Sequence, residues 1–339
     1  MGAVPRPVSA MPANLPPQYH EAERRYRTAR TVPEKIAALQ EMLALMPKHK
    51  GTDHLRAELR AKMARLMDEL EHPAGPRGNR SHPFAIPKEG AGQAALVGPP
   101  NSGKSSILAA LTGAPAKVAH YPFTTQLPQP GMARFQDVHI QLVDTPPLAE
   151  GRLEGRLFGL LRNADALLLV TDLSAGAVAQ AEGTIALLEG WGIEPLGRQQ
   201  RPDPAHWQVQ KPLVVVGNKA DLEGALDEFQ RLEAALGDRF PVVMVSVQEG
   251  VGLDDLVREA FLALGVIRVY TKPPGESPRL DAPLVLPAGS TVEEAAESLH
   301  KSWRQRLKYA LVWGSTRFPG QRVGRDYVLS DRDVIELHG

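Results

Sequence analysis

The sequence predicts an α/β protein in which a mostly parallel sheet carries helices on both faces, with a helical arm before it and a small α+β domain after it. From residue 91, short apolar strands alternate with helices, which is typical of a parallel sheet with crossover helices. Apolar residues recur at helical spacing within residues 19–71. Residues 266–339 instead hold several strands around one helix.

The chain has 339 residues, 43% of them hydrophobic, which is enough to bury more than one core. We expect a disordered Pro-rich N-terminus (1–18), a helical arm (19–72), a linker (73–90), an α/β domain (91–265) and an α+β domain (266–339). Residues 1–90 contain 15 Lys or Arg and 10 Asp or Glu. The α/β domain contains 13 basic and 20 acidic residues, and the α+β domain contains 11 basic and 9 acidic residues. The basic surface therefore lies at the two ends.

Composition excludes several classes of protein. The chain has 39 Lys plus Arg and 39 Asp plus Glu, so as a whole it is neither a basic nucleic-acid binder nor an acidic tail protein. It has no cysteine, which excludes a disulfide scaffold, a thiolate zinc site, an iron–sulfur cluster and a cysteine nucleophile. Prolines interrupt the first 18 residues, and no apolar run approaches the roughly 18 residues of a membrane helix. We expect a cytoplasmic protein with no membrane partner.

The arm contains two stretches of helical periodicity. The first has Ile36, Leu39 and Leu43 on one face and ends at Pro47. The second begins near Thr52 and has apolar residues on one face and arginines elsewhere. Two interpretations of these arginines remain open: a solvated helix face or a contact with a polyanion.

The remaining elements are expected at defined places. The α/β domain is predicted to have strands at 93–97, 138–143, 166–171, 213–217 and 241–245, and helices at 103–112, 177–190, 223–236 and 252–264. Gly131–Val143 predicts a hairpin that turns at Gln136-Asp137, so one strand is antiparallel. The last domain is predicted to have strands near 266–272, 283–287, 307–313 and 334–337, and one helix at 291–303.

A phosphate-binding loop follows the first of these strands. Gly98–Ser105 reads GPPNSGKS, which matches GxxxxGK[ST] between a strand and a helix, the setting that this loop requires. Small residues let backbone N–H groups converge on phosphate oxygens, and the helix N-terminus adds a favourable dipole. Lys104 would reach the β- and γ-phosphates, and Ser105 would bind Mg²⁺. We expect nucleotide contacts from Asn101, Ser102, Gly103, Lys104, Ser105 and Ser106.

Further motifs, in the right order, predict a guanine nucleotide. Asp144, in LVDTP, lies where a second Mg²⁺-holding carboxylate belongs, although an Asp after a strand also fits a simple turn. The Asp221 carboxylate in NKAD can accept hydrogen bonds from N1–H and the exocyclic amine of guanine, a donor pair that adenine lacks. A loop at Ser246 would close over the base. We expect guanine recognition by Asn218, Lys219, Asp221, Ser246 and Val247.

These motifs resemble those of the developmentally regulated GTP-binding (DRG) proteins, within the Obg group of GTPases. GPPNSGKS, YPFTT, VDTP, GWGI and NKAD occur in the family's order. The stretches IRVYTKPPG and KYALVWG near the C-terminus resemble the family's TGS domain, a β-grasp module, and KHKGTDHLRAELRAKMARL resembles its helical arm. The resemblance covers nearly the whole chain from about residue 30. It implies a P-loop GTPase domain followed by a TGS domain.

The resemblance assigns further roles. Thr125 would be the switch I threonine that contacts Mg²⁺ and the γ-phosphate, so Lys104 and Thr125 are the expected catalytic residues. Asn101 lies where potassium-activated relatives place a K⁺ ligand, and it fits an ordinary loop former equally well. Leu148 lies where other GTPases carry a glutamine that orients water, so slow hydrolysis is expected.

Two departures from the family pattern stand out. The family's DxPG is here Asp144-Thr145-Pro146-Pro147, and Pro147 has no backbone N–H to donate to the γ-phosphate. This puts the nucleotide-dependent switch in question more than nucleotide binding. Residues 195–212 form only a short loop where eukaryotic relatives insert an extra domain, so partners that need that insert are not implied.

Two hypotheses for function follow. The first is a slow GTPase, with Mg²⁺ as its cofactor, whose nucleotide state controls contact with the ribosome or ribosomal RNA. The second is a guanine-nucleotide-dependent scaffold that hardly hydrolyses GTP and whose TGS domain docks a protein partner, and Pro147 favours it. NKAD and the lack of a substrate domain argue against an ATP-dependent kinase or transport ATPase.

Overall fold

A computed structural model describes two compact units, residues 1–80 and 81–339. The described residues are 17–28, 32–46, 59, 63, 84–113, 127–148, 155–197, 200–203, 206 and 208–339. Within that part of the chain, no helix has the length and hydropathy needed to cross a membrane.

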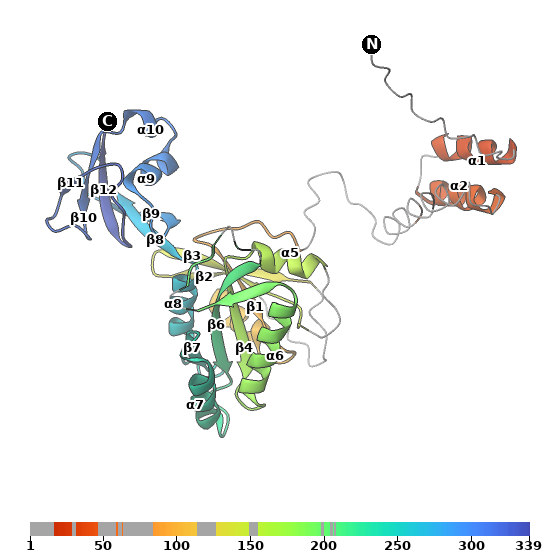
Figure 1. The fold of residues 1–339 in the computed structure, drawn as a ribbon, viewed down its shortest axis with the longest axis horizontal. Helices are drawn as coiled ribbons and strands as arrows, with labels where there is room; N and C mark the ends of the chain where they lie inside the picture. Colours follow the sequence, from red (N-terminus) through yellow and green to blue (C-terminus); the bar gives the residue numbers. More distant parts are fainter. Residues whose placement is uncertain are drawn as a thin grey trace, which may run out of the picture. The chain divides into compact units, whose positions relative to one another are not determined.

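The first unit contains the helices α1 (Pro17–Thr28) and α2 (Val32–Leu45), which lie side by side (Figure 1). They pack through apolar side chains. The buried cluster consists of Tyr19, Ala22, Leu39, Met42, Met46 and Leu59. As predicted, α2 ends just before Pro47. Residues 1–18 were predicted to be disordered, but α1 begins at Pro17, so the last two of them are helical. The other residues of that stretch lie outside the described residues. Of the predicted second arm helix, only Leu59 and Met63 are described.

The second unit begins with a seven-stranded sheet in the order β2-β3-β1-β4-β6-β5, with β7 also paired to β6. The strands are β1 (Gln93–Val97), β2 (Gln129–Phe135), β3 (Val138–Asp144), β4 (Ala166–Asp172), β5 (Ile193–Leu196), β6 (Val209–Asn218) and β7 (Val242–Val245). Only β2 and β3 pair in antiparallel fashion, and they turn at Gln136-Asp137 as the sequence predicts. The carboxyl ends of the parallel strands therefore share one edge of the sheet.

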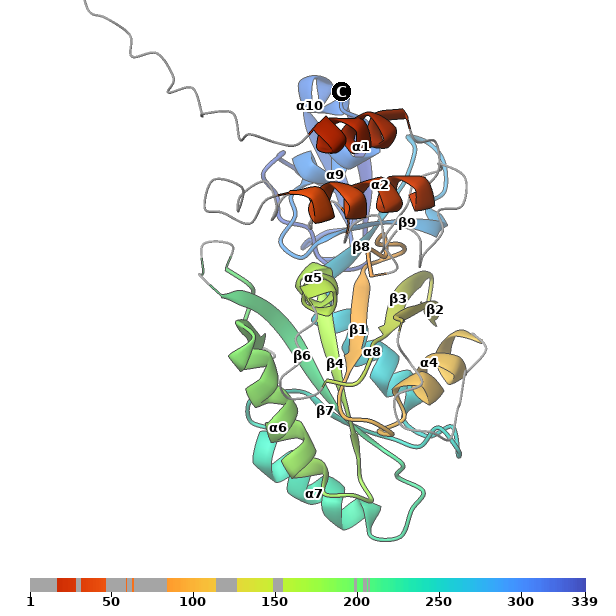
Figure 2. The ribbon, with the colours of Figure 1, turned by 90° about the vertical axis from the view of Figure 1, so that its right-hand side faces the viewer.

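Helices cover both faces of this sheet. We call the sheet together with these helices the seven-stranded domain. They are α4 (Lys104–Thr112), α5 (Gly155–Asn163), α6 (Ala177–Gly190), α7 (Ala225–Leu236) and α8 (Leu253–Ala263). Apolar residues of α5, α6 and α7 form one core cluster, and those of α4 and α8 form another. Figure 2 shows α6 and α7 on one side of the sheet and α4 and α8 on the other. Phe84, inside the predicted linker, is buried in the first cluster.

Three elements of this domain differ from the sequence prediction. Helix α5 was not predicted, because Gly155 and Gly159 weaken its intrinsic propensity and it is held by buried leucines. Strand β5 was also missed; it contains Pro195, which is tolerated at the edge of a sheet. Strand β6 begins four residues before the predicted 213, since it continues through Pro212 to pair with β5.

The second unit ends in a five-stranded domain with the strand order β11-β10-β12-β8-β9. Its strands are β8 (Val266–Thr271), β9 (Arg279–Pro287), β10 (Tyr309–Trp313), β11 (Gln321–Val323) and β12 (Asp333–His338). The one helix predicted at 291–303 is two helices, α9 (Val292–Leu299) and α10 (Trp303–Arg306), because His300 adopts an extended backbone. Strand β11 was missed. A capping box between Thr291 and Glu294 fixes the start of α9.

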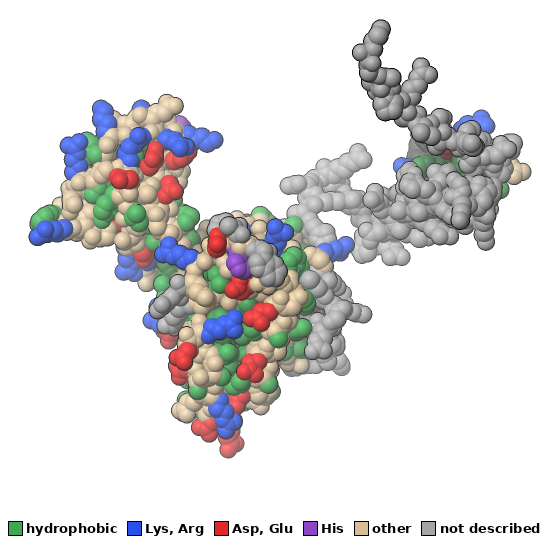
Figure 3. Space-filling view, in the orientation of Figure 1, with side chains coloured by type: hydrophobic (Ala, Val, Ile, Leu, Met, Phe, Trp, Pro, Cys, Tyr) green, Lys and Arg blue, Asp and Glu red, His purple; other side chains and the backbone are tan. Residues whose placement is uncertain are grey.

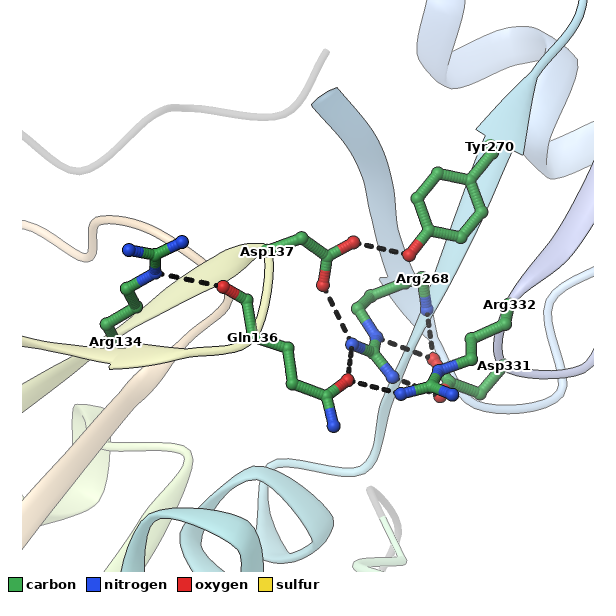
Figure 4. A network of polar contacts seen from close by, with 7 residues as sticks. All are labelled: Arg134, Gln136, Asp137, Arg268, Tyr270, Asp331 and Arg332. Atoms are coloured by element: carbon green, nitrogen blue, oxygen red, sulfur yellow. Dashed lines mark hydrogen bonds and ion pairs between the residues drawn. The ribbon is translucent and has the colours of Figure 1, made fainter. Parts of the chain in front are cut away.

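The two domains of the second unit meet through a polar network centred on Arg268 of β8 (Figure 4). Its side chain is only 3% exposed, and its guanidinium donates to Gln136 Oε1 (2.6 Å), Asp137 Oδ1 (2.8 Å) and Asp331 Oδ2 (2.6 Å). Tyr270 also donates to Asp137. Burial acts to raise the pKa of Asp137, but the hydrogen bonds from Tyr270 and Arg268 outweigh it and lower that pKa. On the face of the molecule seen in Figure 3, side chains of both charge signs are interspersed elsewhere on this unit.

Candidate nucleotide-binding site

The loop Gly98–Ser105 connects β1 to α4 and uses glycine where the chain is most crowded. Gly98 has φ 142°, and a Cβ there would lie 2.3 Å from the carbonyl oxygen of Val170. Gly103 has φ 96°, and its Cβ would lie 2.1 Å from Asn218 Nδ2. No other residue fits these two positions without displacing backbone or an amide. The loop thus ends at the N-terminus of α4, where backbone N–H groups favour an anion such as phosphate.

Asn218 braces this loop from the end of β6. Its Nδ2 donates to the carbonyl oxygen of Ser102 at 2.9 Å, and both residues are buried. Ser102 Oγ in turn donates to the carbonyl oxygen of Pro99 at 3.1 Å. Asn101 has a left-handed backbone (φ 60°) and is exposed, whereas Ser106 is half-buried within α4. The predicted phosphate loop and the NKAD motif are therefore in direct contact.

Lys104 lies inside the loop and is 6% exposed. Its Nζ donates to the carbonyl oxygens of Gly98 (3.0 Å) and Pro99 (2.7 Å). Burial lowers the pKa of Lys104 to about 8, although the nearby Asp144 carboxylate acts to raise it. These bonds hold the ammonium group inside the loop.

Asp144, at the end of β3, lies beside Lys104 and Ser105. Ser105 Oγ donates to Asp144 Oδ2 at 2.5 Å, and the Asp144 residue is 2% exposed. Burial raises the pKa of Asp144, against the hydrogen bond from Ser105 and the charge of Lys104. Three buried side-chain N or O atoms among the described residues have no hydrogen-bond partner, and two of them, Asp144 Oδ1 and Asn218 Oδ1, lie in this site. The adjacent carboxylate and hydroxyl oxygens are the donor type that Mg²⁺ prefers, so they fit this ion.

The residues predicted to recognise guanine lie after the ends of β6 and β7. Asp221 is exposed, and its Oδ1 accepts a hydrogen bond from Ser246 Oγ at 2.6 Å, which holds the carboxylate in place. Ser246 is buried and Val247 is half-buried beside it. Lys219 has φ 66° and forms an ion pair with Asp172 Oδ2 at 2.5 Å. The structure therefore brings the residues predicted from NKAD and from the loop after β7 together.

Asp172 is a site residue that the sequence reasoning missed. It ends β4, accepts hydrogen bonds from the backbone N–H (2.9 Å) and Oγ (2.6 Å) of Ser174, and holds Lys219. Burial acts to raise the pKa of Asp172, but the hydrogen bonds from Lys219 and Ser174 outweigh it and lower that pKa. The sequence offered only a weak signal for it, a carboxylate at the end of a buried strand, which fits a simple turn equally well.

Of the two predicted switch segments, the structure describes the one that follows β3 but not the one that contains Thr125. Thr125, predicted to bind Mg²⁺ and the γ-phosphate, lies outside the described residues, as do Tyr121 and Thr124. Pro147 is half-buried after β3. Leu148 is 5% exposed, and its side chain is buried in the core cluster that contains α5, α6 and α7.

Comparison with known proteins agrees with this geometry. A family described as "50S ribosome-binding GTPase" matches residues 93–219, and the TGS domain family matches residues 267–338. The uncharacterized GTP-binding protein MJ1326 of Methanocaldococcus jannaschii is 31% identical, over 90% of this chain and 92% of the relative. Developmentally-regulated GTP-binding protein 1 of Xenopus laevis is 29% identical, over 89% of this chain and 98% of the relative.

Among solved structures, one similar chain is Era in complex with MgGDPNP and nucleotides 1506–1542 of 16S ribosomal RNA. It is 23% identical, with a TM-score of 0.40, and the match covers 61% of this chain and 64% of Era. The two family matches, at residues 93–219 and 267–338, identify the seven-stranded domain as a P-loop GTPase domain and the five-stranded domain as a TGS domain. This protein belongs to the family of developmentally regulated GTP-binding proteins.

Proposed function

We propose that this chain binds GTP and GDP together with Mg²⁺, hydrolyses GTP slowly, and controls contact with the ribosome or ribosomal RNA through its nucleotide state. The observation that carries the nucleotide chemistry is the buried Asp144 carboxylate, which has one oxygen without a partner beside Ser105 and Lys104. A buried anionic oxygen is costly when it is unpaired. Coordination of Mg²⁺, directly or through water, would satisfy it.

Each residue of the site would have a defined role. Ser105 and Asp144 would hold Mg²⁺, which supplies positive charge at the phosphate oxygens. Lys104 would exchange the Gly98 and Pro99 carbonyls for the β- and γ-phosphates, and the backbone N–H groups at the start of α4 would bind the remaining oxygens. Thr125 is proposed, from the family resemblance, to complete the contact with Mg²⁺ and the γ-phosphate.

Slow hydrolysis is supported by Leu148. A leucine cannot orient a water molecule, and this one is packed in the core of the GTPase domain. The intrinsic rate would therefore depend on the charges around the phosphates alone. Pro147, which cannot donate to the γ-phosphate, supports the second candidate: a scaffold that binds guanine nucleotide, hardly turns it over, and docks a protein through its TGS domain.

Contact with the ribosome is supported by two comparisons. The matching family is described as ribosome-binding, and the Era structure contains a segment of ribosomal RNA. Such a partner is consistent with a cytoplasmic protein.

Sedimentation through a sucrose gradient with a ribosome-containing lysate tests this proposal. We expect the chain to migrate with ribosomes or a subunit in the presence of a non-hydrolysable GTP analogue and to stay near the top with GDP. The Asp221→Asn variant is the matched control, because it should respond to xanthine nucleotides instead of guanine nucleotides. Equal migration with both nucleotides, together with negligible turnover, would favour the scaffold.

A role for K⁺ at Asn101 is a separate part of the proposal. Asn101 is exposed at the phosphate loop, where its side chain could help to place a monovalent cation against the developing charge. We expect faster hydrolysis in KCl than in NaCl, and loss of this difference in Asn101→Ala. Equal rates in the two salts for the parent would make Asn101 an ordinary loop residue.

A further inference from the structure

Lys219, the second residue of the NKAD motif, has a backbone conformation that is uncommon for a side chain of its size. Its φ of 66° lies in the left-handed region, which few residues other than glycine adopt. Hydrogen bonds hold the turn that follows. The backbone N–H of Ala220 donates to the carbonyl oxygen of Val245 at 3.1 Å, and that of Leu222 donates to the carbonyl oxygen of Lys219 at 3.2 Å. The fold therefore fixes the point from which the Lys219 side chain starts.

The other end of this side chain is also held. Its ammonium group forms an ion pair with Asp172 Oδ2 at 2.5 Å, between the end of β6 and the end of β4. The second oxygen, Asp172 Oδ1, accepts hydrogen bonds from the backbone N–H and Oγ of Ser174. The backbone N–H of Asp172 donates to Gln180 Oε1 of α6 at 2.9 Å. Asp172 is thus a fixed group, and the Lys219 side chain is held at both ends.

The strand order places this side chain between the two halves of the predicted site. Strand β4 lies between β1, which leads into the phosphate loop, and β6, which leads into NKAD (Figure 2). The Cα atoms of Asp172 and Asn218 are partners in the β4–β6 register. A nucleotide with its phosphates at Gly98–Ser105 and its base at Asp221 would lie along this edge of the sheet. The stem of Lys219 therefore runs where the base end of that nucleotide would be.

The two members of the ion pair differ in what they can offer a ligand. The Lys219 side chain is 34% exposed, whereas the Asp172 side chain is 13% exposed. A carboxylate repels a nearby polyanionic nucleotide, so Asp172 is poorly suited to bind the ligand itself. The methylene stem of a lysine is apolar and can cover a flat apolar surface while its charged end is bound elsewhere. Asp172 would therefore act on the ligand through Lys219.

We propose that Asp172 is a positioning residue for the nucleotide: by holding the ammonium group of Lys219, it keeps the lysine stem extended as a preformed surface against the base. This inference rests on the proposed function, in which Asp221 selects guanine, and gives Asp172 a separate task. A side chain that is ordered before the ligand arrives avoids the entropy cost of being immobilised on binding. Because the stem contacts the plane of the base and not its polar edge, Asp172 adds affinity without choosing the base.

A double-mutant cycle on GDP affinity, measured by isothermal titration of the full chain in Mg²⁺, tests this inference. Asp172→Asn keeps an oxygen for the bonds from Ser174 but cannot hold the ammonium group with a charge. It should weaken GDP binding by about three- to tenfold, the effect expected when one flexible side chain must be immobilised. Lys219→Met keeps an apolar stem that cannot be held, so it should weaken binding to a similar extent. In the Lys219→Met background, Asp172→Asn should change the affinity by less than about twofold, because the group on which it acts is gone.

Asp165→Asn is the matched control. Asp165 precedes β4 at the opposite edge of the sheet and also pairs with a lysine, Lys88, so its loss should leave GDP affinity within about twofold of the parent. A purely electrostatic role of Asp172 predicts that Asp172→Asn strengthens binding of the anionic ligand. Stronger or unchanged binding in that variant would overturn the proposal. An equal loss in the Lys219→Met background, or in Asp165→Asn, would overturn it as well.

A second variant keeps the test decisive if Asp172→Asn unfolds near the temperature of the titration. Lys219→Arg can still pair with Asp172, so its GDP affinity should stay near that of the parent, and a loss as large as that of Lys219→Met would overturn the proposal. Asp221→Asn separates this inference from the proposed function. Absence of GDP binding by the parent would contradict the proposed function itself. A loss of affinity in Asp221→Asn with none in Asp172→Asn would overturn only the role of Asp172.

Discussion

The nucleotide-binding site and the contact between the GTPase and TGS domains both bury charged groups, but they treat them differently. At the domain contact, Arg268 is bonded to two carboxylates and an amide. At the nucleotide site, Lys104 is bonded only to main-chain carbonyls, and Asp144 and Asn218 each keep an oxygen without a partner. Satisfied polar networks fix a structure, whereas unsatisfied buried groups are unusual in a stable core. The first cluster therefore holds the domains together, and the second is suited to bind a ligand.

The largest effect on stability is expected when the Arg268 network at the domain contact is broken. Arg268→Ala would leave Asp137 and Asp331 without their cation, and loss of one partner from a buried ion pair costs about 3–5 kcal/mol. We expect the free energy of unfolding in guanidinium chloride to fall by about this amount. Arg304→Ala is the control, because its pairs with Glu293 and Glu297 are exposed and should contribute less than about 1 kcal/mol. Similar losses in the two variants would mean that the network does not stabilise the contact.

The next effect concerns ligand binding without loss of stability. Asp221→Asn removes a charged acceptor for guanine, which is worth about 1.5–3 kcal/mol, so affinity for GTP should fall by roughly ten- to hundredfold. Affinity for xanthine nucleotides should rise, because the amide can donate to the C2 carbonyl of xanthine. Isothermal titration measures both. Unchanged GTP and GDP affinities would contradict the assignment of NKAD, and the unfolding midpoint should not move because Asp221 is exposed.

A smaller effect is expected at Pro147. Without a backbone N–H at this position, the parent should bind GTP no more tightly than GDP. Pro147→Gly restores the donor and should raise the ratio of GTP to GDP affinity by roughly tenfold. Titration with GDP and a non-hydrolysable GTP analogue checks this. A ratio that stays within about twofold would show that the missing hydrogen bond is replaced, for example by the Leu148 N–H.

The smallest effect is a change in the pH dependence of stability. Hydrogen bonds from Arg268 and Tyr270 outweigh burial and lower the pKa of Asp137 in the folded protein. A carboxyl group with a lowered folded pKa stabilises the protein above its unfolded pKa of about 3.9, and this contribution is lost as pH falls through the folded pKa. We expect Asp137→Asn to be less stable than the parent at pH 7 and to lose less stability between pH 5 and 3. Parallel curves of denaturation midpoint against pH would contradict this.

Much of the fold was predictable because its signals are local. The strand before Gly98, the glycines of the phosphate loop and the β2–β3 turn at Gln136-Asp137 all have short-range physical causes. The elements that were missed depend on tertiary contacts: α5 on its buried leucines and β5 on its pairing with β6. No sequence pattern indicated that Arg268 would meet Asp137, because 131 residues separate them.

The same distinction applies to the candidate site. The sequence identified the individual motifs, and the strand order explains why their ends share one edge of the sheet. Asp172 was missed because its role, holding Lys219, appears only once β4 and β6 are adjacent. The roles of the site residues, Thr125 and Asn101 included, stay predictions.

The contact between Asn218 and the phosphate loop has a consequence for how this chain can evolve. The Asn218 amide lies so close to Gly103 that one added carbon would collide with it, and it bonds to Ser102 across 116 residues of sequence. A larger side chain at position 103 would therefore displace the Asn218 amide, and a residue without that amide at position 218 would remove the hydrogen bond to the loop. Two motifs that are far apart in the sequence thus pack as one unit, so the residues that either position can accept depend on the other.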